Sequence, residues 1–98
     1  MTIGAALVVA VDCPTTAAKA VIHDEAGLVM AQASFPLRTV QPRPGWHEQD
    51  AEHWWVATRG AVAEAVSALE DPGQVRALCI THQRESFVCL DGNGEPLR

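Results

Sequence analysis

Basic residues and cysteines are both scarce in this 98-residue chain. Seven Lys and Arg stand against twelve Asp and Glu, which gives a formal net charge of −5 at pH 7. This charge repels nucleic-acid phosphates and anionic lipid, so we expect neither as a partner. The three cysteines show neither the Cys-x-x-Cys spacing of a zinc site nor the density of a disulfide-stabilised domain. We therefore expect reduced thiols in a cytoplasmic protein.

A long hydrophobic segment is also missing. The apolar run at 5–11 has no Lys or Arg before it, and Asp12 and Pro14 follow it at once, which is unlike a signal peptide or a membrane span. Hydrophobic residues at 48% and charged residues at 19% are typical of a soluble globular protein. At this length we expect one small domain and no deep active site built by this chain alone.

The first third of the sequence predicts an antiparallel three-strand meander. The strand candidates are 5–11, 18–23 and 28–37. The first is a continuous apolar run, as in strands buried on both faces. Short polar turns separate the three segments, and short connections favour antiparallel hairpins. Pro36, Pro42 and Pro44 then predict an irregular crossing loop.

One main helix is expected after this loop. Asp50 is a good N-cap, and an apolar face recurs with helical spacing to about residue 69. The residues of that face are Trp55, Val62, Val66 and Leu69, and Thr58 and Ala65 help to fill it. The segment 71–73, Asp-Pro-Gly, ends the helix.

A second buried strand is predicted at 75–80, parallel to the first because the helix supplies the crossover. Cys79 within it is expected to be a small buried hydrophobe. A further strand is predicted at 87–90, followed by a turn at 91–94. The sequence stops soon after this turn, which indicates an incomplete domain.

The turn after the first strand is the first candidate site. Asp12, Thr15, Thr16 and Lys19 place a carboxylate, two hydroxyls and an ammonium near one strand end, where ligand sites gather in α/β proteins. Carboxylate oxygens suit Mg²⁺, and hydroxyls and ammonium suit phosphate. The alternative is an ordinary turn, because Asp and Thr are common turn residues.

The second candidate site is the polar run 81–85 after the later strand. Within it, Gln83, Arg84 and Glu85 offer a fork of donors and a pair of acceptors, which suits a polyhydroxylated ligand. The alternative is a solvated turn with a surface ion pair. Farther back, His47 and His53 lack metal-site spacing, and the nearby tryptophans are better explained by packing.

Three motifs in order resemble the amino-terminal part of the FGGY carbohydrate kinases, which include glycerol kinases and xylulokinases. They are the turn 12–16 with Lys19, the segment 44–50 before two tryptophans, and the run 80–85. The resemblance covers nearly the whole chain, 1–98, as part of that domain. It implies an actin-like ATPase fold with a ribonuclease-H-like mixed sheet, in which ATP and a sugar or polyol meet in a cleft.

Residue roles follow from the resemblance alone. It implies that Asp12 helps to organise Mg²⁺ and that Thr15, Thr16 and Lys19 approach the phosphates of ATP. It also implies that the run from Gln83 to Glu85 binds substrate hydroxyls. Two departures stand out: the family usually has Gly where this chain has Pro14, and the family's catalytic Asp base lies in a later segment that this sequence does not contain.

We therefore expect part of a carbohydrate kinase that is inactive alone. The alternative is a non-catalytic interaction module that self-associates through uncovered sheet surface. A small ribonuclease-H-type nuclease is a weaker third possibility, because the chain is acidic and shows no clear carboxylate cluster.

Overall fold

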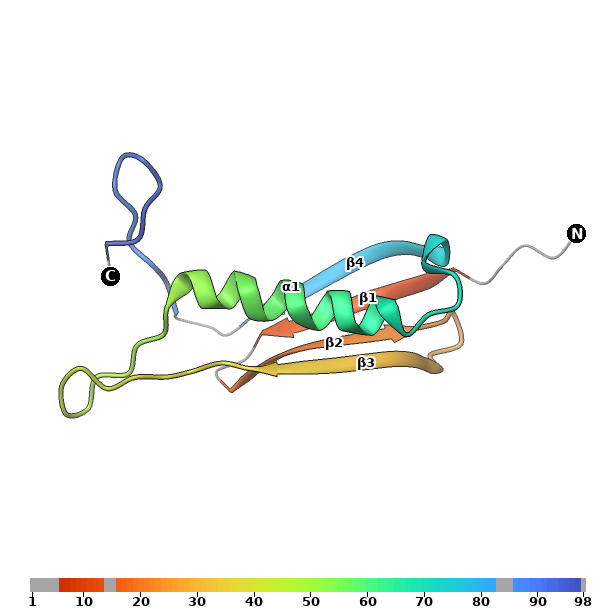
Figure 1. The fold of residues 1–98 in the computed structure, drawn as a ribbon, viewed down its shortest axis with the longest axis horizontal. Helices are drawn as coiled ribbons and strands as arrows, with labels where there is room; N and C mark the ends of the chain where they lie inside the picture. The colour runs from red at the N-terminus through yellow and green to blue at the C-terminus, as the bar shows by residue number, and fades with distance from the viewer. Residues whose placement is uncertain (1–5, 14–15, 83–85, 98) are drawn as a thin grey trace, which may run out of the picture.

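The computed structural model describes residues 6–13, 16–82 and 86–97, which form a four-stranded sheet with one helix packed on one face (Figure 1). The strand order is β3-β2-β1-β4. In chain order the elements are β1 (Leu7–Cys13), β2 (Ala17–His23), β3 (Val29–Pro36), α1 (Ala51–Ser67), the short 3₁₀ helix η1 (Pro72–Gln74) and β4 (Val75–His82).

The sheet is mixed, as the sequence predicts. β1, β2 and β3 form an antiparallel meander, and β4 pairs with β1 in parallel. The meander turns tightly at Asp24, whose side chain accepts hydrogen bonds from the N–H groups of Ala26 and Leu28, both at 2.9 Å. Gly27 in this turn has φ 86°, a conformation that glycine adopts without strain. α1 supplies the crossover that a parallel strand pair needs.

The core lies between the sheet and α1. Val9 and Val11 of β1 and Ile22 of β2 are at most 1% exposed, and burial of each stabilises the fold by about 1.5–3 kcal/mol. The helix contributes small residues to this core: Ala57, Ala61 and Ala65 recur every four positions and are all buried. Because alanine has a short side chain, this stripe lets the helix backbone lie close to the strands.

Two predictions of burial are wrong, one for the helix and one for β1. Trp55 is 57% exposed, because the alanine stripe, and not the tryptophan, faces the sheet. Val62, Val66 and Leu69 do pack against the core while partly buried. In β1 burial alternates along the strand, since α1 covers only one face of the sheet.

The prediction of a buried strand at 75–80 is also wrong in its burial. β4 is an edge strand, and Leu78, Cys79 and Ile80 are exposed, because α1 packs mainly over β2 and β3. The predicted strand at 87–90 does not form; within 86–97 a single bridge joins Leu90 to Pro96. The turn between them is confirmed, with the Asp91 side chain accepting from two backbone N–H groups.

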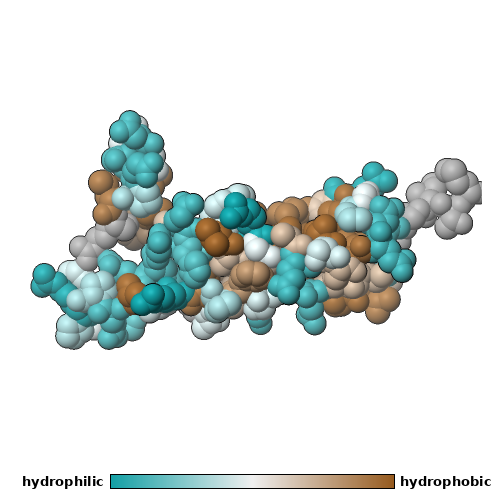
Figure 2. Space-filling model, in the orientation of Figure 1, coloured by the Kyte–Doolittle hydropathy of each residue, from teal (hydrophilic) through white to brown (hydrophobic). Residues whose placement is uncertain are grey.

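The crossing loop projects beyond the sheet and is held by backbone and side-chain hydrogen bonds (Figure 1). Val40 and Glu48 exchange two backbone hydrogen bonds of 2.8 and 2.9 Å. The Gln49 side chain then links loop to helix, donating to Thr39 Oγ1 at 2.9 Å and accepting from Trp54 Nε1 at 2.8 Å. Trp54 also packs against the cluster of Ala18, Leu37 and Ala57, which confirms the packing prediction for it, whereas Trp46 is 43% exposed. Figure 2 shows that the projecting loop is mostly hydrophilic, whereas apolar surface gathers over the sheet and helix.

The alanine stripe gives the first test. Ala61→Leu places three extra heavy atoms between helix and sheet, and we expect the free energy of unfolding to fall by about 1–3 kcal/mol. Ala63→Leu is the matched control at an exposed position two residues away, with an expected change within about 0.5 kcal/mol. Urea unfolding followed by circular dichroism measures both. Equal effects of the two substitutions would contradict the assigned packing.

Candidate functional site

Parallel pairing of β1 with β4 brings the carboxyl ends of the two strands to the same end of the sheet. At that end Asp12 is paired with Lys19 of β2 on one side and with Thr81 of β4 on the other. The Thr81 hydroxyl donates a hydrogen bond to Asp12 Oδ1 at 2.9 Å. Residues that are 69 positions apart in sequence therefore meet at one place.

The three side chains share the sheet face that α1 does not cover. Val11, which precedes Asp12, is buried beneath the helix, so the alternation of a strand points Asp12 to the opposite face. Paired residues of neighbouring strands lie on the same face, which places Lys19 and Thr81 with it. All three residues are exposed. This face thus presents a carboxylate, an ammonium and a hydroxyl on open surface.

Cys13 ends β1 on the other side of the sheet. It is half-buried against the small cluster of Ala18, Leu37 and Ala57, and its sulfur accepts a weak hydrogen bond from Thr58 Oγ1 at 3.9 Å. This contact ties the end of β1 to the helix. The packing fixes the strand end from behind while Asp12 faces outward.

The structure places only some of the residues expected in the two sites. Asp12 and Lys19 come together, and Thr16 is exposed in the turn between their strands, with its carbonyl accepting from the Leu37 N–H at 2.9 Å. Thr15 and the run 83–85, which contains Gln83, Arg84 and Glu85, lie outside the described residues. Thr81 belongs to the predicted polar run 81–85 but has no separate role in that prediction; its contact with Asp12 follows from the parallel strand register.

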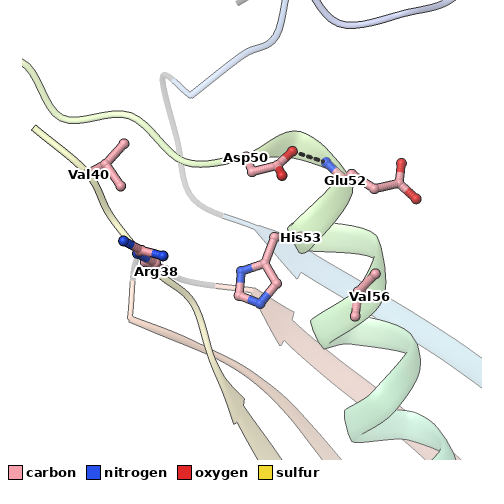
Figure 3. Close-up of a pocket in the computed structure, with 6 residues that line it drawn as sticks. All are labelled: Arg38, Val40, Asp50, Glu52, His53 and Val56. Atoms are coloured by element: carbon pink, nitrogen blue, oxygen red, sulfur yellow. Dashed lines mark hydrogen bonds between the residues drawn. The ribbon is translucent and has the colours of Figure 1, made fainter. Parts of the chain in front are cut away.

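A separate recess lies between the crossing loop and the start of α1, with a volume of about 500 Å³ (Figure 3). Its lining residues are Arg38, Val40, Asp50, Glu52, His53 and Val56. The Asp50 carboxylate accepts from the Glu52 N–H at 3.0 Å, as an N-cap does. Asp50 therefore has a structural role here, as its position in the sequence predicts.

Neither a metal cluster nor a membrane helix occurs in the part of the chain that the structure describes. Over 6–13, 16–82 and 86–97, no three His, Cys, Asp or Glu side chains group as metal ligands would. No helix of these residues is both long and apolar enough to cross a membrane. Among the described residues, Asp12 is therefore not part of a metal-binding group of three such side chains.

The fold is that of a carbohydrate kinase domain, and sequence comparison gives the family. Residues 7–98 match the model of the N-terminal domain of the FGGY family of carbohydrate kinases, so the chain belongs to this family. It is 35% identical over 91 residues to a glycerol kinase of Thermococcus kodakarensis, and 40% identical over 93 residues to one of Paracidovorax citrulli. These alignments cover 92% and 90% of this chain but 18% of each relative.

Solved structures agree with this assignment. The xylulose kinase of Rhodospirillum rubrum superposes with a TM-score of 0.84 at 34% identity, covering 94% of this chain and 19% of that one. A Plasmodium falciparum glycerol kinase with ADP has a TM-score of 0.80 at 21% identity, which shows the shared fold. The prediction of a partial, actin-like ATPase domain with a mixed sheet and one main helix is confirmed. The chain spans about a fifth of the length of these kinases.

The Thr81–Asp12 hydrogen bond gives a second test. Thr81→Val removes the donor but keeps a β-branched side chain that suits a strand. Both partners are exposed, so we expect the free energy of unfolding to change by no more than about 1 kcal/mol. The ¹³C shift of the Asp12 carboxyl should move while the shifts of core methyl groups stay in place. A loss of cooperative unfolding in the variant would show that the bond holds the fold rather than orienting the carboxylate.

Proposed function

We propose that residues 1–98 are the amino-terminal part of an ATP-dependent kinase that phosphorylates a polyol or a ketose. The chain contributes part of the Mg²⁺ and phosphate site and part of the sugar site. The observation that carries this proposal is that Asp12, Lys19 and Thr81 lie together on the uncovered face, at one end of the sheet. Relatives named glycerol kinase and xylulose kinase support the class of substrate.

The residues at this end of the sheet have donor groups that suit Mg²⁺·ATP. Asp12 offers hard carboxylate oxygens, which Mg²⁺ prefers, and one or two carboxylates are usual when phosphates supply other ligands. Lys19 offers an ammonium for phosphate oxygens, and Thr16 and Thr15 offer hydroxyls. When bound, Mg²⁺·ATP supplies the transferable phosphoryl group with part of its charge neutralised.

The chain's own residues act by positioning charge. In phosphoryl transfer, catalysis is mostly alignment plus stabilisation of charge spread over phosphate oxygens. The Thr81 hydroxyl, by donating to Oδ1, orients the Asp12 carboxylate and leaves its other oxygen for a cation. Pro14 has no N–H to give a phosphate, so side chains carry more of the binding here than in relatives with glycine.

The sugar side of the proposed site begins where β4 ends. Gln83, Arg84 and Glu85 follow His82 directly, and their guanidinium, carboxylate and amide groups suit ligand hydroxyls. The catalytic base that the family resemblance implies lies in a segment absent from this sequence. The 98-residue chain therefore binds without turning over.

A chimera tests the proposal. The segment 7–98 replaces the aligned segment of the Thermococcus kodakarensis glycerol kinase, and we expect ATP-dependent phosphorylation of glycerol. Asp12→Asn in this chimera should lower kcat/KM by about 100-fold or more, the size of effect seen when one stabilising group is removed. Glu64→Gln removes the same charge from the exposed face of α1 and should leave the rate unchanged.

The isolated chain serves as the matching negative. With ATP, Mg²⁺ and a panel of polyols and ketoses, it should form no phosphorylated product. Turnover by the isolated chain would contradict the proposed division of the site. An active chimera that is indifferent to Asp12→Asn would contradict the role of Asp12.

A further inference from the structure

The small cluster of Ala18, Leu37 and Ala57 lies behind the proposed phosphate site and has no role in the proposed function so far. Its three residues are at most 8% exposed and come from β2, from the first position after β3 and from α1. The cluster is separate from the main core, which contains Val9 and Ile22. Its side chains are therefore buried by segments of this chain itself.

This small cluster holds the two described residues that flank positions 14–15. On one side Cys13 packs against it and accepts the weak hydrogen bond from Thr58. On the other side the Thr16 carbonyl accepts from the Leu37 N–H at 2.9 Å, while the Leu37 side chain is buried in the cluster. Leu37 therefore holds Thr16 through its backbone and supports Cys13 through its side chain.

Trp54 ties the small cluster to the crossing loop. Its indole packs against the cluster, and its Nε1–H donates to Gln49 Oε1 at 2.8 Å. Gln49 in turn donates to Thr39 Oγ1 at 2.9 Å, and Thr39 follows Leu37 closely along the chain. These contacts form a closed circuit, because Gln49 holds the same segment that brings Leu37 to the cluster.

We propose that Trp54 is a positioning residue for the phosphate-binding groups at the start of β2, an inference that rests on the proposed function. The indole and its bond to Gln49 hold Leu37, and Leu37 holds Thr16. Thr16 precedes β2 and Lys19 lies within it, so a movement of this strand end shifts the hydroxyl and the ammonium together. Trp54 lies on the helix-covered side of the sheet, so it acts through Leu37 and does not touch the phosphates.

The scalar coupling across the Leu37–Thr16 hydrogen bond tests the geometric part in the isolated chain. This coupling joins the amide nitrogen of Leu37 to the carbonyl carbon of Thr16 and falls as the hydrogen bond lengthens. Trp54→Phe keeps an aromatic ring but removes the donor to Gln49. We expect the coupling to fall in this variant, while couplings across the β1–β2 pairing stay unchanged.

Steady-state kinetics of the chimera that carries residues 7–98 test the functional part. Trp54→Phe should raise the KM for ATP by about twofold to tenfold, the fold-change that corresponds to one hydrogen bond. The kcat and the KM for glycerol should stay unchanged, because a loss of uniform binding raises KM alone. Thr39→Val removes the acceptor for Gln49 at an exposed position and should move the coupling and the KM for ATP in the same direction.

Two controls separate positioning from stability. Trp55→Phe makes the same substitution at the neighbouring tryptophan, which is 57% exposed, and should change neither the coupling nor the KM for ATP. Ile22→Val removes a buried methyl group from the main core. It should lower the thermal midpoint of unfolding of the isolated chain and leave the KM for ATP unchanged.

The two measurements distinguish failure of this inference from failure of the proposed function. An unchanged Leu37–Thr16 coupling in Trp54→Phe would overturn the inference whether or not the chimera is active, because this measurement needs no nucleotide. An active chimera would also overturn it if Trp54→Phe left the KM for ATP unchanged, or if Ile22→Val raised that KM equally. A chimera that does not phosphorylate glycerol would count against the proposed function, and the coupling would still decide whether Trp54 positions Thr16.

Discussion

The parallel pairing of β1 with β4 is the constraint on which the candidate site depends. It places Thr81 beside Asp12, and the antiparallel pairing of β1 with β2 places Lys19 on the other side. The contact with Thr81 spans 69 positions in sequence, so the full cluster exists only when the crossover through α1 is formed. The buried residues of β1 hold the central strand from one face, which leaves the other face to present polar groups.

The order of elements and the nearness of Lys19 to Asp12 could be predicted from local patterns. Asp50 marked the start of α1, short polar turns indicated the meander, and the helix required β4 to run parallel to β1. Burial could not be predicted in the same way. An apolar run such as 75–80 indicates a strand whose side chains favour burial, but it does not show which element, if any, covers that strand. Hence Cys79 was expected inside and is exposed.

The residues that α1 buries could not be predicted from hydrophobicity alone either. Large apolar residues dominate a hydrophobicity pattern, so the prediction puts Trp55 on the apolar face with Ala65 and leaves out Ala57 and Ala61. The helix packs closely on the sheet through its small side chains, so Ala57, Ala61 and Ala65 form the buried stripe. Trp55 is exposed to solvent, with the Arg59 guanidinium 5.7 Å from its ring centre. The roles proposed for 83–85 rest on the family resemblance and on their position directly after β4.

Replacement of Mg²⁺ by paramagnetic Mn²⁺ tests the central claim most directly. In the presence of ATP, Mn²⁺ broadens the amide resonances of residues close to the bound cation. The account predicts that broadening in the 98-residue chain is greatest at Asp12, Lys19 and Thr81 and is lost in Asp12→Asn. Broadening centred instead on the recess beside His53, or spread evenly over the chain, would contradict it.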